Sequence, residues 1–283
     1  MKKVLSFDIG GTNTRLALVN ENFEIEKELV YPTVRDSKEA FLANIKKIIC
    51  DLDINMDEVC AIGAGVPGVV NRETGYIYDL PNVHIKDIPF GDFIKDEFNK
   101  KVYLRNDAEV ACLAEASVGT HKKYSRVFFI TISTGLGGAL VVDGLNQDYI
   151  TEIGHTAYKY QGKMMEYEGL ASGTGLVKLC ELNGLKINSS REFFNLVSSK
   201  DEKALYVYKQ WLSILSDFIS MIEDSYSPDV ICVTGGVMKA KDLFFKDLCD
   251  LNPLSNIVVC YHSEHAGIIG AAVYAFKMLD FLK

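Results

Sequence analysis

The sequence predicts an α/β protein made of two related halves, and three observations support this class. Segments with the apolar pattern of strands alternate with segments whose apolar residues have helical spacing. The stretch LSFDIGGTNTRLALV, residues 5–19, has the form of a strand, a glycine-rich turn and a second strand. FFITISTGLGGALVV, residues 128–142, repeats that form position by position. Two related halves predict a cleft between two lobes, where ligands usually bind.

The first half is expected to begin with that strand pair and a third strand over residues 23–31. Ser37 is the expected N-cap of a helix with an apolar face formed by Phe41, Ile45, Ile48 and Ile49. VCAIGAGVPGVV, residues 59–70, predicts a buried strand that breaks at its glycines and proline. KVYLRNDAEVACLAEA, residues 101–116, predicts a strand, a polar turn and a helix.

The second half is expected to contain, after the repeated strand pair, a long amphipathic helix. Its apolar face is formed by Trp211, Leu215, Phe218, Ile219 and Ile222. A third glycine turn follows in VICVTGGVM, residues 230–238. HAGIIGAAVYAFKMLDFLK, residues 265–283, predicts a closing helix with small residues in its first turns, which allow close packing.

Charge and composition exclude several functional classes. The chain of 283 residues has a net charge of −8 and no long basic run, so we expect no nucleic-acid partner. It has no apolar run of membrane-spanning length and no secretory leader, so we expect no membrane partner. The seven cysteines are odd in number and scattered, which is typical of reduced and mostly buried thiols in a cytoplasmic protein.

The two matched turns have the composition of an anion site. Backbone N–H groups in a glycine-rich turn can point inward together, and hydroxyl groups add donors. Neither turn is a Walker A loop or a dinucleotide-binding fingerprint, because the motif GxxxxGK[ST] is absent and each turn leads into a strand. One such turn alone could be an ordinary hairpin, whereas two favour a ligand site. The expected donors are Gly10, Gly11, Thr12, Thr14, Ser133, Thr134, Gly135, Gly137 and Gly138.

Two carboxylates are candidates for roles in phosphoryl transfer. Asp8 lies on the first turn, and a carboxylate that faces a phosphate needs a cation between them, for which Mg²⁺ held through water is suited. Asp107 follows a buried strand and opens a helix, so it could accept the proton of an attacking hydroxyl group. The alternative is that Asn106 and Asp107 cap this helix.

The chain resembles the ROK family (repressor, open reading frame, kinase) of the sugar kinase/actin/Hsp70 superfamily over nearly its whole length. The resemblance rests on six motifs in the family's order: DIGGTNTRLALV, GAGVPGVV, RNDAEVACLAEA, ISTGLGGALVVDG, EIGH and VTGGV. It implies a two-lobed, actin-like (ribonuclease H-like) ATPase fold with a duplicated β-sheet core. The N-terminal lobe would be residues 1–116 completed by the helix 266–283, and the C-terminal lobe residues 117–265.

The resemblance also implies roles for individual residues. Asp107 would be the catalytic base, and Asp8 would hold Mg²⁺ of the bound ATP through water. The sugar would contact Gly65, Asn82, Asn106, Asp107, Glu152, His155 and Glu168. The nucleotide would contact Asp8, Gly10, Gly11, Thr12, Asn13, Thr14, Arg15, Ser133, Thr134, Gly135, Gly137, Gly235 and Gly236. Family members also lead us to expect a homodimer.

Two segments depart from the family's pattern. Many members have three cysteines after the GH pair that hold a structural Zn²⁺ with the histidine. Here KYQGKMMEYE, residues 159–168, has Lys159, Gln161 and Glu166 at those positions, so we predict no zinc. His155 would then hydrogen-bond the sugar directly, or else only pack. Packing of Met164, Met165 and Tyr167, with local pairing of Glu166, would fix the segment. The loop DGLNQDYITEIGH, residues 143–155, is also shorter than usual.

These features predict an ATP-dependent kinase that phosphorylates the 6-hydroxyl group of a hexose or N-acylhexosamine. The zinc-free pattern most resembles N-acetylmannosamine kinases, and glucokinase is the alternative. A sugar-sensing ROK regulator would carry a helix-turn-helix module, whereas the first strand here is expected from residue 4. A non-catalytic sensor or scaffold is disfavoured because Asp8, Asp107 and both glycine turns are present.

Overall fold

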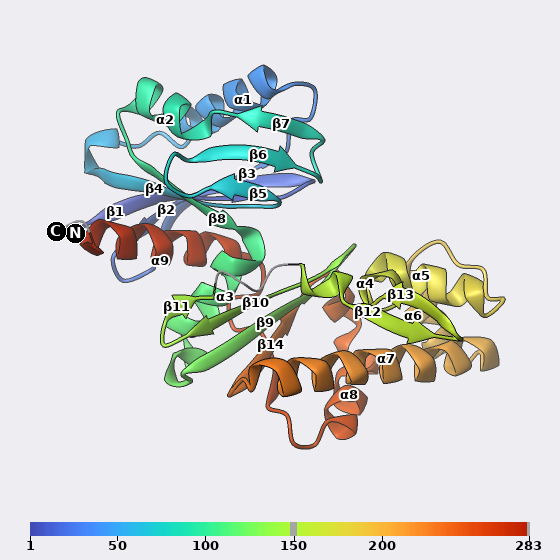
Figure 1. Ribbon diagram of the computed structural model, residues 1–283. Helices are drawn as coiled ribbons and strands as arrows, with labels where there is room; N and C mark the ends of the chain where they lie inside the picture. Colours follow the sequence, from blue (N-terminus) through green and yellow to red (C-terminus); the bar gives the residue numbers. More distant parts are fainter. Residues whose placement is uncertain (148–151, 282–283) are drawn as a thin grey trace. The chain divides into compact units, whose positions relative to one another are not determined.

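The computed structural model describes residues 1–147 and 152–281. Part of the shortened loop, residues 148–151, and the end of the closing helix, residues 282–283, lie outside the described residues. The chain divides into two compact units (Figure 1). The first unit contains Met1–Lys122 and Tyr261–Lys283, and the second contains Lys123–Cys260. That a ligand binds in a cleft between two lobes stays a prediction.

Each unit is built on a five-stranded mixed sheet, and the two sheets have the same topology. The first has the order β3-β2-β1-β4-β8 and the second β11-β10-β9-β14-β15. In both, the first three strands in sequence are antiparallel neighbours and the later two are added in parallel. The strands of the first sheet are β1 (Lys3–Ile9), β2 (Asn13–Asn20), β3 (Ile25–Pro32), β4 (Val59–Val66) and β8 (Val102–Asn106). Those of the second are β9 (Arg126–Ile132), β10 (Leu136–Val142), β11 (Leu145–Asn146), β14 (Val230–Thr234) and β15 (Ile257–Val259). The predicted duplication of the core is confirmed.

Strand β1 alternates between two differently covered faces. Leu5, Phe7 and Ile9 join one apolar cluster with the buried face of α1 (Lys38–Asp51) and with α2 (Phe90–Phe98). Figure 1 shows α1 and α2 on this side and α9 (Ala266–Phe281) on the other. On the α9 side Ser6 donates a hydrogen bond to the carbonyl of Ile268, and α9 also packs against α3 (Asp107–Ser117). This alternation directs Asp8 toward α9.

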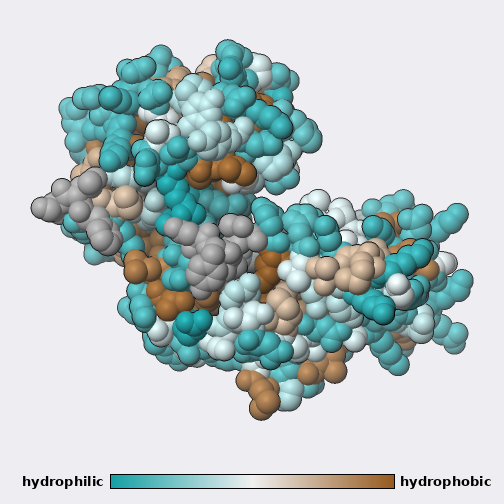
Figure 2. All heavy atoms as spheres, viewed as in Figure 1, coloured by the Kyte–Doolittle hydropathy of each residue, from teal (hydrophilic) through white to brown (hydrophobic). Residues whose placement is uncertain are grey.

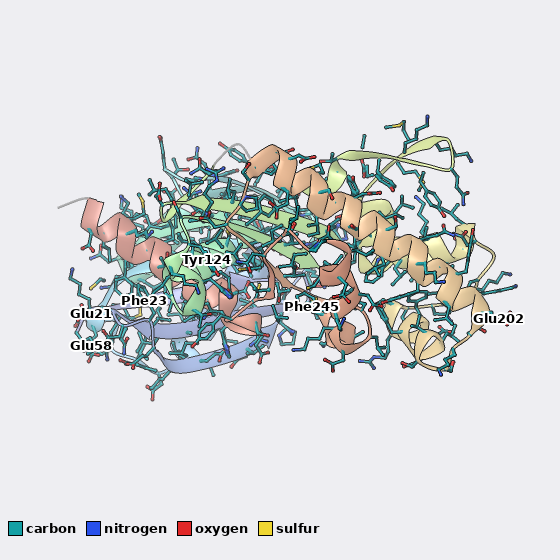
Figure 3. The ribbon with its side chains drawn as sticks, turned by 90° about the horizontal axis from the view of Figure 1, so that it is seen from below. Glu21, Phe23, Glu58, Tyr124, Glu202 and Phe245 are labelled. Carbon is teal, nitrogen blue, oxygen red and sulfur yellow. The ribbon has the colours of Figure 1, made fainter. Side chains whose placement is uncertain are left out.

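The predicted N-cap of α1 is confirmed, since the Ser37 hydroxyl accepts the backbone N–H of Ala40. The turn after β2 is anchored by an aromatic pair, in which the ring centroid of Phe23, labelled in Figure 3, lies 5.9 Å from that of Phe276 in α9. A three-stranded sheet was not predicted from sequence. Its strands are β5 (Val69–Asn71), β6 (Tyr76–Leu80) and β7 (Ile85–Ile88).

The second unit has its core between the sheet and a group of helices. The longest is α7 (Glu202–Tyr226), whose first residue is labelled in Figure 3, and its predicted apolar face is buried. Trp211 is fully buried, and its indole N–H donates to the carbonyl of Ala171 over 3.0 Å. The other helices are α4 (Glu168–Ala171), α5 (Gly173–Leu182), α6 (Ser190–Ser198) and α8 (Phe245–Leu251). A hairpin joins β12 (Ala157–Tyr160) to β13 (Lys163–Glu166).

Short 3₁₀ segments complete both units. They are η1 (Met56–Glu58), η2 (Thr120–Lys123), η3 (Ile153–His155), η4 (Gly236–Leu243) and η5 (Ser263–His265). The face drawn in Figure 2 is largely hydrophilic, with hydrophobic residues in small groups. Within the described residues, no helix has both the length and the apolar character needed to cross a membrane. The seven cysteines, all within the described residues, form no disulfide with one another, and four of them are buried.

Helix α9 approaches its neighbours so closely that it requires glycine at the contacts. A Cβ atom on Gly270 would lie 1.7 Å from the carbonyl oxygen of Val110 in α3. A Cβ atom on Gly63 in β4 would lie 2.1 Å from the carbonyl oxygen of Ala271. Since backbone atoms cannot be displaced as a flexible side chain can, these glycines set the distance between α9, α3 and the sheet.

We therefore expect Gly270→Ala to destabilise the protein by about 2 kcal/mol or more, because the added methyl group forces α3 and α9 apart. Gly169→Ala is the matched control, since its nearest contact is the Lys178 Nζ atom at 4.0 Å. That control should change the free energy of unfolding by about 1 kcal/mol or less. Urea denaturation followed by circular dichroism measures both. Equal stabilities for the two variants would contradict the proposed closeness of α3 and α9.

Candidate functional site

Polar residues gather at the carboxyl ends of three parallel strands in the first unit. Asp8 in β1 lies beside Gly65 in β4, and Val66 lies beside Asn106 at the end of β8. A Cβ atom on Gly65 would lie 2.5 Å from a methyl carbon of Val110, so this strand passes close under α3. The parallel register therefore brings together four of the predicted site positions, namely Asp8, Gly65, Asn106 and Asp107.

Asn106 and Asp107 form the junction between β8 and α3. Asn106 caps the helix, because its Oδ1 atom accepts the N–H of Ala108 over 2.9 Å. One Asp107 carboxylate oxygen accepts the same N–H over 2.8 Å. The capping interpretation is thus correct for Asn106, and the cap also fixes the Asp107 backbone at the start of a buried helix. A carboxylate held in this way is preoriented for proton transfer.

The surroundings of Asp8 disfavour the ionised form of its carboxyl group. A Cβ atom on Gly267 at the start of α9 would lie 2.5 Å from the Asp8 carboxyl carbon, so glycine is needed for this packing. Burial raises the pKa of Asp8 to about 7, the Asp107 carboxylate adds to the increase, and Arg15 opposes it. Two neighbouring carboxylates of this kind supply the hard oxygen ligands that Mg²⁺ prefers, so the residues fit a divalent cation.

The first glycine turn is held by its own backbone and by a residue that sequence reasoning missed. The N–H of Gly10 donates to the carbonyl of Asn13 over 2.9 Å. Thr33 donates its hydroxyl to the carbonyl of Gly10 over 2.7 Å and its N–H to the carbonyl of Thr12 over 2.9 Å. Thr14 is fully buried and its hydroxyl lies 3.0 Å from that of Thr33. Thr12 and Asn13 are exposed, so they present the polar groups of this turn to solvent.

The remaining predicted residues of the first unit surround this turn. Asn82 packs against Gly11, where a Cβ atom would lie 2.9 Å from the Asn82 Cβ. Arg15 forms ion pairs with Glu28 at 3.2 Å and Glu264 at 3.1 Å. Arg35, which was not predicted, donates to the carbonyl of Gly11. Asn82 and the turn are therefore in contact, as a shared site requires.

A buried ionic cluster supports the β8–α3 junction. Glu109 is 3% exposed and lies in the first turn of α3. Its carboxylate accepts hydrogen bonds from Arg72 at 2.9 Å and from Arg105 at 3.2 Å. Arg105 also lies 4.8 Å from the ring centroid of Tyr274 in α9. Sequence reasoning missed this cluster, because Arg72 and Tyr274 are remote in the chain.

The second glycine turn connects β9 to β10 and is bonded to two other segments. Ser133 accepts the N–H of Gly236 on its hydroxyl over 3.0 Å and the N–H of Gly173 on its carbonyl over 2.6 Å. Thr174 donates its hydroxyl to the carbonyl of Thr134 over 2.6 Å. Gly235 has φ = +109°, and a Cβ atom there would lie 2.3 Å from the carbonyl oxygen of Ile132, so only glycine fits. The second and third glycine turns thus form one structure.

A cavity of about 750 Å³ opens beside these turns, a volume suited to a small-molecule ligand. It is lined by Ser133, Thr134, Gly173, Thr174, Val177, Asn188, Ser189, Ser190, Arg191, Phe194, Asn195, Gly236, Val237, Lys239, Ala240 and Leu243. Ser133, Thr134 and Gly236 were predicted from sequence. The contributions of α6 and of the rest of η4 were missed, although they include two cations, Arg191 and Lys239, and an aromatic ring, Phe194.

His155 lies among carboxylates. Its Nδ1 atom is 2.9 Å from Glu166, and its Nε2 atom is 3.6 Å from Glu152. The hydrogen bond with Glu166 and the charges of the surrounding glutamates raise the pKa of His155, which favours imidazolium. The local pairing expected for Glu166 is therefore present. Of the residues expected to pack, Tyr167 is buried and Met165 partly so, but the prediction for Met164 is wrong because this side chain is 67% exposed.

Glu168 joins this acidic group to the second glycine turn. Its carboxylate accepts the N–H of Leu136 over 2.8 Å, and a Cβ atom on Gly135 would lie 2.5 Å from one of its oxygens. Gly137 pairs with Thr131 across the β9–β10 hairpin. The second unit therefore brings the expected phosphate turn and one expected sugar ligand, Glu168, into direct contact.

Comparisons with known proteins agree with this architecture. The sequence model of the ROK family matches residues 4–277. A glucokinase from Thermotoga maritima is 26% identical over 311 aligned positions, covering 95% of this chain and 96% of the relative. An N-acetyl-D-glucosamine kinase from Shigella flexneri is 26% identical, covering 94% and 97%. The structure of a candidate N-acetylmannosamine kinase from Listeria monocytogenes has a TM-score of 0.84 at 23% identity, covering 98% of this chain and 99% of that one.

The pKa of Asp8 generates a test that does not depend on activity. Because the pKa is raised from 3.8 to about 7, the native protein holds a proton that the unfolded chain releases. The associated stability is fully present below pH 3.8 and is lost as the pH rises through about 7. In EDTA, Asp8→Asn should therefore be more stable than the wild type at pH 8, and the advantage should shrink toward pH 5.

Calorimetry at both pH values measures this difference, with Asp57→Asn, an exposed residue of η1, as the control. If the stabilities of Asp8→Asn and the wild type change with pH in the same way, Asp8 does not titrate in this range.

Proposed function

This chain belongs to the ROK family as a sugar kinase, and on that premise we propose that it transfers the γ-phosphate of ATP to the 6-hydroxyl group of a hexose or N-acylhexosamine. The observation that carries the proposal is the pair of neighbouring carboxylates, Asp8 and Asp107, at the carboxyl ends of β1 and β8. A kinase needs one group that takes a proton and one that holds a cation. These two positions can supply both.

Asp107 is the proposed catalytic base. The oxygen of the sugar hydroxyl attacks the γ-phosphorus, the bond from that phosphorus to the β–γ bridging oxygen breaks, and ADP leaves. Asp107 accepts the hydroxyl proton during the attack. Asn106, Asn82 and the strand edge at Gly65 are proposed to hold the other hydroxyl groups. Glu109 and the two arginines that it binds keep the first turn of α3 in place.

Asp8 is the proposed holder of Mg²⁺, through water. The ion would neutralise charge on the phosphates, which a bare carboxylate pair would repel. The raised pKa of Asp8 has a consequence for binding, because near neutral pH the carboxyl group must release its proton when the cation binds. Cation affinity should therefore increase with pH up to about 8.

The cavity of the second unit is the proposed nucleotide site. Phosphates would face the turn at Ser133 and Thr134, whose glycine neighbours leave the backbone accessible. The cations of Arg191 and Lys239 suit an anionic ligand, and the ring of Phe194 and the aliphatic wall of Val237 suit a base. The first turn, residues 10–15, is proposed to complete the phosphate contacts.

For the acceptor we propose N-acetylmannosamine, with glucose as the second candidate. The segment after His155 lacks the cysteines found in many relatives, and Glu166 pairs with this histidine instead. His155, Glu152 and Glu168 are the proposed sugar ligands in the second unit, since they offer both donors and acceptors. The names of the glucokinase and N-acetylglucosamine kinase relatives support glucose and N-acetylglucosamine as alternative acceptors. A cytoplasmic homodimer is the proposed form of the protein.

A sugar panel tests the proposal. ADP release should be measured with Mg²⁺-ATP and N-acetylmannosamine, N-acetylglucosamine, glucose or mannose, and the product located by NMR. N-acetylmannosamine should give the highest kcat/KM, with phosphate on the 6-oxygen. A higher value for glucose would select the second candidate, and no turnover with any hexose would refute the kinase assignment. Light scattering during size-exclusion chromatography tests the dimer.

Asp107→Asn should lower kcat by about 10² to 10⁴, because the amide is nearly isosteric but cannot accept the proton. Sugar affinity by calorimetry should change little. Asp143→Asn, remote in sequence and outside the proposed site, is the control and should keep its turnover. Near-normal turnover of Asp107→Asn would remove this residue from the mechanism.

The absence of structural zinc stays a prediction. Elemental analysis of the purified protein should find no stoichiometric zinc. Dialysis against a strong chelator should leave activity intact once Mg²⁺ is restored, because His155 is oriented by Glu166. One tightly held zinc per chain, or loss of structure on chelation, would mean that this chain holds the metal with other ligands.

A further inference from the structure

The chain passes between its two units twice, and both connecting segments are bonded to one buried side chain. The first passage leaves the first unit after Lys122, and the second returns to it at Tyr261. Glu115, in the last turns of α3, contacts the residues next to each passage. Its side chain has no exposed surface, which is unusual for a glutamate.

The Glu115 carboxylate accepts hydrogen bonds from both connecting segments. Its Oε2 atom lies 2.6 Å from His121 Nδ1 and accepts the N–H of Tyr261 over 3.0 Å. Its Oε1 atom accepts the N–H of His262 over 2.9 Å. Because an ionised carboxylate only accepts hydrogen bonds, Nδ1 of His121 is the protonated nitrogen in this arrangement.

Two further contacts join the same segments directly. His262 Nε2 lies 3.0 Å from the carbonyl oxygen of Val118, within hydrogen-bond distance. Gly119 has φ = +88°, and a Cβ atom there would lie 2.5 Å from the ring of Tyr261. The residues that leave the first unit and those that return to it therefore form one packed structure around Glu115.

A buried carboxylate is stable only while its hydrogen-bond donors stay in place. Loss of a donor leaves charge unsolvated in a medium of low polarity, at a cost larger than that of a neutral hydrogen bond. Glutamine cannot replace Glu115, although it has the same shape. Its NH₂ group would face either the N–H of His262 or the N–H of Tyr261 together with the His121 ring.

We propose that Glu115 is a positioning residue that holds both connecting segments to α3 through hydrogen bonds, so that the two segments change conformation together. Helix α3 begins at Asp107 and also packs against α9, which follows the second segment. Any change in the conformation of the connections is thereby transmitted to the helix that carries the proposed base. The expected effect on catalysis rests on the proposed function. The coupling of the two connecting segments does not depend on it.

Hydrogen exchange on the full chain tests the coupling. His121→Ala removes one donor from the first segment and leaves the carboxylate in place. It should speed exchange of the Tyr261 and His262 amides in the second segment by about tenfold or more, because they share the acceptor. Glu115→Gln should speed exchange in both segments. Glu181→Gln, an exposed residue of α5, is the matched control and should leave both unchanged.

Protection of β1, β4, β9 and β14 should stay at the wild-type level in all three variants. Unchanged exchange at residues 261 and 262 in His121→Ala would overturn the proposal. So would exchange that increases throughout the first unit, since Glu115 would then be a general stability residue. If Glu115→Gln does not fold, the His121→Ala result decides.

Kinetics with the best sugar of the panel provides the second readout. If Glu115 holds both connecting segments, His121→Ala should lower kcat and raise the sugar KM together. Substitutions at connections between units often have this effect. A change in neither would refute the catalytic consequence. Absence of turnover in the wild type would refute the proposed function. The coupling of the two segments would then be tested by hydrogen exchange alone.

Discussion

The close approach of α9 to β1, β4 and α3 is the constraint on which the first unit depends. Three glycines make it possible, and each meets backbone or carboxylate atoms where a methyl group would not fit: Gly63, Gly267 and Gly270. Helix α9 packs against both α3 and β1, and the Asp107 charge at the start of α3 raises the pKa of Asp8 in β1. The same packing that removes apolar surface from water therefore concentrates negative charge.

This concentration of charge explains why the surroundings of the site are so extensively bonded. Arg15 faces Asp8 and is itself paired with Glu28 and Glu264. Arg72 and Arg105 pair with Glu109, which lies in the same first turn of α3 as Asp107. Of these arginines, Arg15 lowers the pKa of Asp8 but does not outweigh burial and the Asp107 charge, which keep it raised. A divalent cation would neutralise such neighbouring carboxylates.

The sequence patterns predicted the sheets well, because strands and glycine turns are local features. Repetition of the turn at residues 10–12 and 133–135 identified the duplicated core, although Asp8, expected on the turn, lies within β1. The three-stranded sheet β5–β7 was missed because its strands have only three to five residues each, too few to show a clear alternation. Asn188, Ser189 and Arg191 are typical of any helix start, so nothing local marked them as lining a cavity.

The side-chain partners that could not be predicted lie far away in the chain. Glu115 bonds a residue 146 positions away, and Arg15 bonds one 249 positions away. Such partners are decided by the packing of α3 and α9, which no periodicity within either helix reveals. Roles taken from the family resemblance are different in kind, since the geometry brings Asp8, Asn106 and Asp107 together without testing what they do.

The first unit is built from two segments of the chain that are separated by the whole second unit, and this has a consequence for synthesis on the ribosome. Its sheet emerges early, but the helix that covers the Ser6 face of β1 is synthesised only after the whole second unit. The second unit is continuous in sequence, so it can complete its own core first. Until residues 261–281 emerge, the α9-binding face of the nascent first unit stays uncovered. Chains truncated before α9 should therefore be substrates for chaperones, even though the strands of both five-stranded sheets have been made.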